Sequence, residues 1–236
     1  MKAVILAGGR GTRLAPHTTI LPKPLLPLGD KPILDVIIRQ LRHHGITDIT
    51  LAVGHLAGLL MSYFGDGRQF GVRISYSREE KPLGTAGPLR LVPGLAETFL
   101  VMNGDVLTTL DFRDLLANHQ ARRGLGMVAV QTRRIPIDLG VVEHDADCRL
   151  TRYVEKPVHD ARVSLGIYAF EPRVLEFIPS GEYLDLPDLM TRLIQAGEPV
   201  YCHPFEGYWM DIGRSEDYAR AAADFDELEL RLFRSG

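Results

Sequence analysis

The first 28 residues contain the stretch that decides the fold, AVILAGGRGTRLAPHTTILPKPLLPL (residues 3–28). Residues 3–6 predict a strand that is buried on both faces, and Gly8, Gly9 and Gly11 follow it almost at once. In open α/β sheets the carboxyl ends of parallel strands border a ligand crevice. Glycines at such a strand end let the backbone approach a phosphate or a base closely. The stretch therefore indicates an α/β fold with an anion site after its first strand.

Two cations beyond the glycines strengthen this interpretation. Arg13 can reach phosphate oxygens with its guanidinium, and Lys23 stands between Pro22 and Pro24, which restrict the local backbone. Taken alone, each feature could be an ordinary glycine turn or a solvated cation. The pattern G-x-x-x-x-G-K-S/T is absent, and Leu14 stands where G-x-G-x-x-G needs its third glycine. The cluster as a whole predicts phosphate binding by a different kind of loop.

The composition is that of an ordinary globular protein of 236 residues, 45% hydrophobic and 24% charged, with a formal net charge of −3. This balance indicates neither a nucleic-acid surface nor a membrane surface, so any phosphate binding is local. No apolar run is long enough to cross a bilayer, and no signal peptide is recognisable. Cys148 and Cys202 are expected to be buried free thiols. We expect a cytoplasmic protein without nucleic-acid or membrane partners, and the question of a homo-oligomer stays open.

Apolar runs alternate with amphipathic segments along the chain. Strands are expected at residues 3–6, 48–53, 72–76, 99–102, 127–130, 140–144, 149–155, 163–170 and 208–212. Helices are expected at residues 33–41, 56–64, 85–92, 112–123, 186–196 and 215–232. The alternation in the first half predicts a parallel sheet that is covered by helices on both faces, and the second half is richer in strands. We expect one α/β domain over residues 1–236.

The segment GGRGTRLAPHTTILPKPLLPLGDKP (residues 8–32) closely resembles the signature of the sugar-1-phosphate nucleotidyltransferases. The family pattern reads roughly GGxGTRLxPxTxxxPKPLxPxxxKP, and the resemblance continues to Asp211 and the segment after it. It implies a Rossmann-like, mostly parallel mixed sheet flanked by helices, with a strand-rich sugar-binding lobe. It also implies an enzyme that makes an NDP-sugar and pyrophosphate from an NTP and a sugar-1-phosphate. Many relatives add a C-terminal β-helix, which we do not expect in a chain that stops soon after Leu232.

The resemblance implies a set of nucleotide-binding residues. Arg13 and Lys23 would be the catalytic cations, with Arg13 at the departing pyrophosphate and Lys23 near the α-phosphate. Gly84 and Thr85 resemble the base-binding loop of the family, and Glu79 precedes them. The predicted nucleotide-binding residues are Leu6, Ala7, Gly8, Gly9, Gly11, Thr12, Glu79, Gly84, Thr85 and Asn103.

The acids before this loop bear on the choice of base. A carboxylate only accepts hydrogen bonds, so Glu79 suits a base edge that presents donors. Guanine presents an N–H and an amino group together, and cytosine presents one amino group. GTP is therefore favoured and CTP is second, while two solvated acids, Glu79 and Glu80, remain the alternative. The segment EEKPLGTAGPL (residues 79–89) also resembles the mannose-1-phosphate guanylyltransferases, which favours a mannose-1-phosphate-like substrate.

Two carboxylates are candidate metal ligands. Asp105 follows the predicted strand at 99–102, where a carboxylate can hold Mg²⁺ against a phosphate, although Asn-Gly-Asp is also an ordinary turn. Asp211 lies in the apolar stretch YWMDIG, where an acid is costly to bury unless it is paired or binds a metal. The resemblance assigns both aspartates to the metal, so the expected cofactor is Mg²⁺.

The resemblance also implies a sugar-phosphate site. In EKP (residues 155–157), Glu155 would hold sugar hydroxyls and Lys156 the phosphate, with an exposed ion pair as the alternative. Gly140 resembles the glycine that passes close to the sugar. Ser164 begins a Ser-Leu-Gly segment where the family often has Asn-Ala-Gly. This departure lies where the sugar would sit, so the identity of the sugar stays open.

Other functions remain open at this stage. A cytidylyl-, uridylyl- or thymidylyltransferase for another sugar-1-phosphate would use the same loop. A phosphocholine cytidylyltransferase would want an aromatic cage, for which Tyr208 and Trp209 are candidates. A non-catalytic regulatory subunit that binds nucleotide sugar would tolerate the loss of the charged positions. An enzyme is favoured because all five are present: Arg13, Lys23, Asp105, Lys156 and Asp211.

Overall fold

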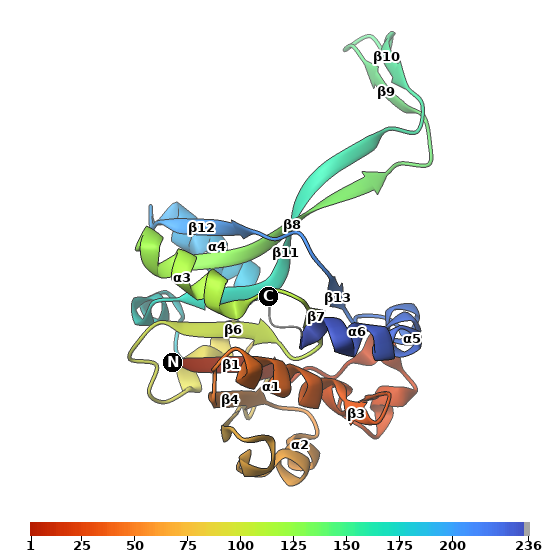
Figure 1. The fold of residues 1–236 in the computed structure, drawn as a ribbon. Helices are drawn as coiled ribbons and strands as arrows, with labels where there is room; N and C mark the ends of the chain where they lie inside the picture. The colour runs from red at the N-terminus through yellow and green to blue at the C-terminus, as the bar shows by residue number, and fades with distance from the viewer. Residues whose placement is uncertain (234–236) are drawn as a thin grey trace.

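The computed structural model describes residues 1–233, and its centre is a seven-stranded sheet of order β12-β8-β11-β6-β1-β4-β5 (Figure 1). β11 is antiparallel to both of its neighbours, whereas the other pairings are parallel. The strands are β1 (Lys2–Ala7), β4 (Asp48–Val53), β5 (Arg73–Arg78), β6 (Phe99–Asn103), β8 (Gly126–Pro136), β11 (Val158–Phe170) and β12 (Val200–Pro204). The predicted Rossmann-like, mostly parallel mixed sheet is confirmed.

Helices cover both faces of this sheet because its central strands are apolar on both sides. In β1, Ile5 packs into one core and its neighbour Val4 into the other, and both are fully buried. The first core is covered by α1 (Ile33–His43), α2 (Ala57–Phe64), α3 (Phe112–Arg122), α5 (Ser215–Ala223) and α6 (Phe225–Leu232). The second is covered by α4 (Leu186–Gln195) and two 3₁₀ helices, η5 (Gly87–Leu91) and η6 (Pro172–Phe177).

Short elements complete the chain around the edges of the sheet. Three two-stranded pairs join β2 (Pro27–Leu28) to β3 (Lys31–Pro32), β7 (Val106–Thr108) to β13 (Trp209–Asp211), and β9 (Val141–His144) to β10 (Leu150–Val154). The remaining 3₁₀ helices are η1 (Thr12–Leu14), η2 (His17–Thr19), η3 (Lys23–Leu25) and η4 (Arg68–Phe70). The β7–β13 pair has a direct consequence for function, because it carries residues near position 210 to the end of β6.

Several local expectations are corrected by the structure. The short helix expected at 85–92 is a 3₁₀ helix that spans only Gly87–Leu91. The helix expected at 215–232 is divided at Asp224, and the break lets Phe225 pack on Gly29, where an added Cβ would lie 2.9 Å from the ring. Cys148 and Cys202 are free, as expected, but both are exposed rather than buried. Cys148 lies in the turn between β9 and β10, where no core is available.

The strand-rich second half builds an arm, which we define as residues 131–163. Beyond the rung Ser164–Val130, β8 and β11 stay paired as far as Val158–Pro136, and the ribbon ends in the β9–β10 hairpin. Figure 1 shows this ribbon standing away from the rest of the molecule. The strands expected at 127–130 and 163–170 were too short, because the outer residues of β8 and β11 are largely polar and exposed.

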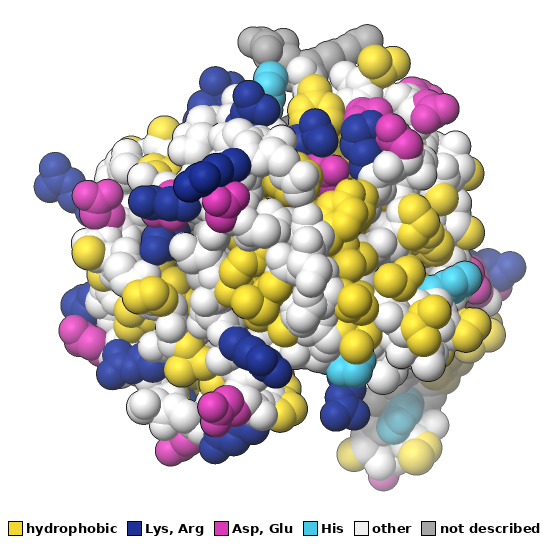
Figure 2. Space-filling model, turned by 90° about the horizontal axis from the view of Figure 1, so that it is seen from below, with side chains coloured by type: hydrophobic (Ala, Val, Ile, Leu, Met, Phe, Trp, Pro, Cys, Tyr) yellow, Lys and Arg dark blue, Asp and Glu magenta, His cyan; other side chains and the backbone are white. Residues whose placement is uncertain are grey.

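The opposite end of the molecule, beside α2, shows charges of both signs interspersed with hydrophobic side chains (Figure 2). Leu59, Met61 and Tyr63 of α2 are among the large hydrophobic side chains that stay exposed. None of the helices in residues 1–233 is both long enough and apolar enough to cross a membrane.

Candidate active site

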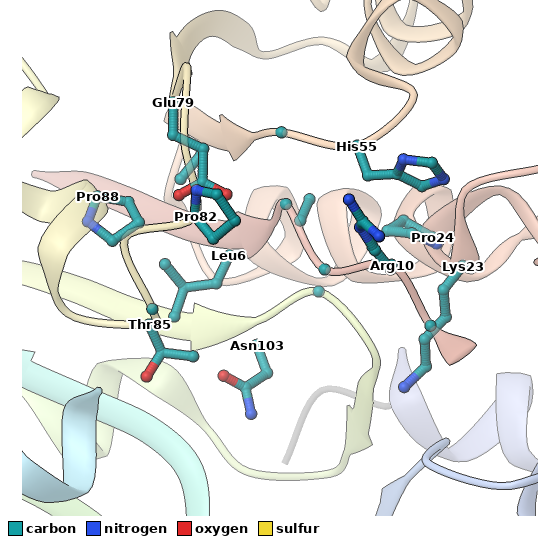
Figure 3. Close-up of a pocket in the computed structure, with 18 of the residues that line it drawn as sticks. Leu6, Arg10, Lys23, Pro24, His55, Glu79, Pro82, Thr85, Pro88 and Asn103 are labelled. Carbon is teal, nitrogen blue, oxygen red and sulfur yellow. The ribbon is translucent and has the colours of Figure 1, made fainter. Parts of the chain in front are cut away.

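A cavity of about 1100 Å³ lies at the carboxyl ends of four neighbouring parallel strands. β1 contributes Leu6 and Ala7, while β4, β5 and β6 contribute Ala52, Arg78 and Asn103. In Figure 3, Glu79 and Thr85 lie on one side of the cavity, and Arg10 and Lys23 lie on the other. The crevice predicted after the first strand is therefore present, with Glu79 and Lys23 on opposite sides.

The glycine loop forms the floor between these two sides. Gly11 has a φ of 62°, and a Cβ there would lie 3.0 Å from Cγ2 of Thr18 and 3.3 Å from Cβ of Lys23. The Thr18 hydroxyl donates a hydrogen bond of 2.8 Å to the carbonyl oxygen of Gly11. This close packing needs glycine, and it fixes the loop against the segment that carries Lys23.

Lys23 is held rigidly beside the first aspartate. It begins η3 directly after Pro22, whose φ is −64°, and only 8% of Lys23 is exposed. Its ammonium group forms an ion pair with Asp105. Asp105 is placed by the turn after β6, in which the amide of Gly104 donates a 2.9 Å hydrogen bond to the carbonyl oxygen of Leu6. Two motifs that lie 82 residues apart thus meet at one point.

The second aspartate reaches the same place through β13. In the β7–β13 ladder Asp211 pairs with Val106, and the amide of Ile212 donates a 3.0 Å hydrogen bond to the carbonyl oxygen of Asp105. A Cβ at Gly213 would lie 3.6 Å from the Asp211 carboxylate oxygens and 3.8 Å from a terminal nitrogen of Arg13. Arg13, Lys23, Asp105 and Asp211 therefore form one cluster.

The electrostatics of this cluster favour a cation. One carboxylate oxygen of Asp105 and one of Asp211 are buried without a hydrogen-bond partner. Burial raises the pKa of Asp211, and the charge of Asp105 adds to this effect, while Lys23 and Arg13 oppose it. Unsatisfied carboxylate oxygens suit a hard divalent ion. Within residues 1–233 no group of three or more His, Cys, Asp or Glu side chains could hold a metal, so further ligands would come from a bound phosphate.

The other side of the cavity carries Glu79. One of its carboxylate oxygens accepts a 3.0 Å hydrogen bond from the amide of Leu83. The other lies against the backbone of Gly8 and Gly54, 3.0 and 2.6 Å from the positions that Cβ atoms there would occupy. Burial raises the pKa of Glu79. The side chain is therefore fixed where a ligand on the glycine loop would meet it.

The loop at Gly84 and Thr85 is held by hydrogen bonds to residues about 100 positions later in the chain. The amide and the hydroxyl of Thr85 lie 2.9 and 3.1 Å from one carboxylate oxygen of Asp185, to which both donate. The Thr85 hydroxyl also accepts a 2.7 Å hydrogen bond from the amide of Leu186. Gly84 has a φ of 77°, and a Cβ there would lie 2.4 Å from the carbonyl oxygen of Leu184. Only glycine fits this contact.

A second cavity of about 830 Å³ adjoins the cluster on its far side. Arg13 lines both cavities, and Asp211 lines the second one together with residues at the root of the arm, including Arg133. Trp209 also borders this cavity, where its indole nitrogen donates a 2.9 Å hydrogen bond to the carbonyl oxygen of Leu165. The guanidinium of Arg133 lies 5.2 Å from the centre of the Trp209 ring. This space continues the site toward the arm.

The predicted site residues fall into three groups, one of which is Asp211 alone, on the second cavity. The first lines the large cavity: Leu6, Ala7, Gly8, Gly9, Gly11, Thr12, Arg13, Lys23, Glu79, Gly84, Thr85, Asn103 and Asp105. The predicted sugar-phosphate residues line neither cavity. Gly140, Glu155 and Lys156 lie on the arm, and Ser164 lies at its root, 3.1 Å from the hydroxyl of Tyr168. The structure does not bring Glu155 and Lys156 to the cluster, so their role stays a prediction.

Some lining residues were missed by the sequence analysis. Gly54 and His55 follow β4 as the glycine loop follows β1, so a search for strand ends would have found them. Asp185 had no local signal, because its contact with Thr85 spans 100 residues. The other missed residues are Arg10, Pro24, Ala52, Arg78, Lys81, Pro82, Pro88, Gly104 and Tyr183.

A Rossmann-like sheet with a glycine-rich, cationic cavity at its strand ends defines a nucleotide-binding protein of the α/β class. A family model described as nucleotidyl transferase matches residues 2–227, and the chain belongs to this family. The resemblance drawn from the glycine-rich signature is thereby confirmed.

Similar proteins include enzymes named for different nucleotides. The chain is 38% identical to a UTP–glucose-1-phosphate uridylyltransferase of Synechocystis, over 98% of its own length and 65% of that protein. It is 37% identical to a mannose-1-phosphate guanyltransferase of Neurospora crassa, over 92% of its own length and 62% of that protein. The chain thus spans a little less than two thirds of the length of these relatives.

A solved structure shares the fold over nearly its whole length. It is that of a Bacillus anthracis protein assigned as a glucose-1-phosphate thymidylyltransferase, in complex with sucrose. The TM-score is 0.77 at 28% sequence identity, and the match covers 94% of each chain.

Proposed function

We propose that the protein is a sugar-1-phosphate nucleotidyltransferase that acts in the cytoplasm. The observation that carries this proposal is the cluster of Lys23, Arg13 and two aspartates beside the glycine loop. It supplies cations for phosphates and unsatisfied carboxylate oxygens for a divalent ion at one point. The reaction joins an NTP and a sugar-1-phosphate to give an NDP-sugar and pyrophosphate.

The cavity suits an extended nucleotide. The base would lie at Glu79 and Thr85, the ribose would pass Leu6 and Asn103, and the phosphates would reach Lys23 (Figure 3). The backbone amides of the glycine loop would meet the phosphates. This placement puts the phosphates beside Arg10 and Lys23 and leaves the base on the side of Glu79.

The reaction needs positioning and charge neutralisation more than proton transfer. A phosphate oxygen of the sugar-1-phosphate, already ionised at neutral pH, bonds to the α-phosphorus, while the bond from that phosphorus to pyrophosphate breaks. Lys23 would hold the α-phosphate, and Arg13 would stabilise the charge on the departing pyrophosphate. Asp105 and Asp211 would hold Mg²⁺, which supplies further positive charge to the phosphates when it is bound.

We infer which base the protein prefers from the position of the Glu79 carboxylate. The carboxylate is fixed between Gly8 and Gly54, where it can accept hydrogen bonds from an amino group and a ring N–H. Guanine presents both, so we favour GTP, with a mannose-1-phosphate-like partner. The named relatives use different bases, so the uridylyl, thymidylyl and cytidylyl alternatives belong in the same experiment.

A phosphocholine substrate is less well supported. The indole of Trp209 is packed against Arg133, and the ring of Tyr208 lies 5.6 Å from the guanidinium of Arg231. Both rings are thus already covered by cations, whereas a choline site needs open aromatic faces.

The decisive experiment crosses four NTPs with several sugar-1-phosphates and phosphocholine, and reads pyrophosphate release with and without Mg²⁺. We expect release only with an NTP, a sugar-1-phosphate and the metal together, and fastest with GTP. Binding of nucleotide sugar without any release would instead favour a regulatory subunit.

A further inference from the structure

The arm poses a geometric problem for the proposed function. Lys156, the predicted ligand of the sugar phosphate, lies next to the outermost rung of the ladder, Val158–Pro136. The second cavity reaches along the arm as far as Arg133, which pairs with Ala161, and three residues, about 10 Å at about 3.3 Å per residue, still separate that rung from the outermost one. No lysine side chain spans this gap, so the arm of one chain leaves its own cavity without the lysine.

The arm also lacks a core of its own. None of the buried side chains in residues 1–233 lies between positions 131 and 163. Large hydrophobic side chains along the arm are about half exposed or more: Ile135, Leu139, Val142, Leu150, Tyr153 and Val158. A two-stranded ribbon is only marginally stable in water, and exposed apolar side chains of this kind mark an interaction surface.

Hydrogen bonds at the root of the arm oppose its closure onto the cavity of the same chain. Gln131 donates a 2.8 Å hydrogen bond to the carbonyl oxygen of Gly207, and Arg133 donates one of 3.3 Å to that of Trp209. Both strands would have to bend together, yet β8 contains no glycine between Gly126 and its end at Pro136. Only β11 carries an irregularity, between Ser164 and Tyr168. The arm is therefore built to point outward.

We propose that the arm of one copy completes the site of a second copy, with Glu155 and Lys156 of the first beside the cavity of the second. The inference rests on the proposed function, because it assigns these residues to the sugar phosphate. The occupant is another copy of this chain, since the arm carries the residues that the cavity lacks. A two-fold arrangement exchanges both arms and yields two complete sites.

Complementation tests the exchange directly. Lys23→Ala disables the cavity and Lys156→Ala disables the arm, so each variant alone should lose most activity at a sugar-1-phosphate concentration below the wild-type KM. The two are co-expressed with different tags, and the mixed oligomers are purified on both tags. In a mixed dimer the cavity of the Lys156→Ala copy receives an intact arm, so about half of wild-type activity should return. Closure of each arm onto its own cavity predicts no recovery, and that result would overturn the proposal.

A matched control pairs two variants that both damage the cavity and leave the arm intact. Lys23→Ala paired with Asp105→Ala damages both cavities, so their mixed oligomers should stay inactive. Recovery in this pair as well would show that mixing restores activity for another reason, and the exchange would be rejected.

A second measurement does not depend on activity. Cys148 lies exposed in the turn at the tip of the arm, so a benzophenone label can be placed there in a Cys202→Ser background. Irradiation should join two chains, with the linked peptides coming from the arm of one copy and the body of the other. Links within single chains only, by mass spectrometry of mixed heavy and light protein, would refute the exchange. Between-chain links in a protein without transferase activity would refute the proposed function alone.

Discussion

The cavity and the arm hold the two halves of the predicted site, and they differ in how far the side chains are buried and held in place. Lys23 is 8% exposed and paired with Asp105, within a cluster fixed by strand ladders and prolines. Lys156 stands on a ribbon whose side chains are largely exposed, at a backbone φ of 43°. Under the proposed function this difference separates two tasks: the cavity would be preorganised for the nucleotide and its phosphates, whereas the arm would bring the ligands of the second substrate to a site that is already built.

The largest effect expected from this contrast concerns the two lysines. Lys23→Ala should lower kcat by about 10²–10³-fold, because a fixed positive charge at the reacting phosphate is lost. Lys156→Ala should mainly raise KM for the sugar-1-phosphate, with KM for the NTP little changed. Steady-state pyrophosphate release at varied concentrations of each substrate separates the two outcomes. Equal effects on both KM values would erase the proposed division between cavity and arm.

The metal site gives the next largest effect. Mg²⁺ should raise the melting temperature of the wild type, because an ion that binds only the folded state stabilises it. Asp211→Asn should abolish this shift and most of the turnover. Asp217→Asn is the matched control, since Asp217 lies beside the same second cavity and pairs with Arg220. A Mg²⁺ shift that survives in Asp211→Asn would remove this aspartate from the metal site.

A smaller effect is expected at the base. Glu79→Gln keeps the size of the side chain but replaces one acceptor oxygen with a donor group. The ratio of kcat/KM for GTP to that for UTP should fall about tenfold or more, as expected for the loss of one good base contact. Glu80→Gln serves as the control, because Glu80 also lines the cavity but is more exposed. An unchanged ratio in Glu79→Gln would show that Glu79 does not read the base.

The smallest effect concerns the stability of the body. His44 accepts a 3.0 Å hydrogen bond at Nδ1 from the amide of Phe112, and burial lowers its pKa below the ordinary value of 6.5. The folded state therefore binds fewer protons than the unfolded state below about pH 6.5, so stability falls as the pH falls through this range. Denaturant unfolding at pH 7.5 and 5.5 should show a larger loss in wild type than in His44→Gln. An equal loss in both would exclude His44 as a source of acid sensitivity.

The residues of the cavity could be predicted from the sequence far better than the course of the arm. Neighbours only a few residues away in the chain fix the positions of the cavity residues. The glycine loop, Lys23 and Asp105 each follow a strand or a proline that fixes them within a few residues. Asp185 could not be foreseen, because only tertiary packing brings it to Thr85. The outward course of the arm was hidden as well, since its strands mix exposed hydrophobic and polar side chains and pack against no core that would fix their direction. The same absence of a core explains why Cys148 proved exposed.

The pairing of β7 with β13 also has a consequence for the order of events during synthesis. A nascent chain that has emerged up to β7 already contains the glycine loop, Lys23 and Asp105. It still lacks Asp211, which is supplied more than one hundred residues later. A fragment that ends at β7 thus holds Lys23 and Asp105 without the second carboxylate, so the cluster that we propose to hold Mg²⁺ is complete only once β13 has been made.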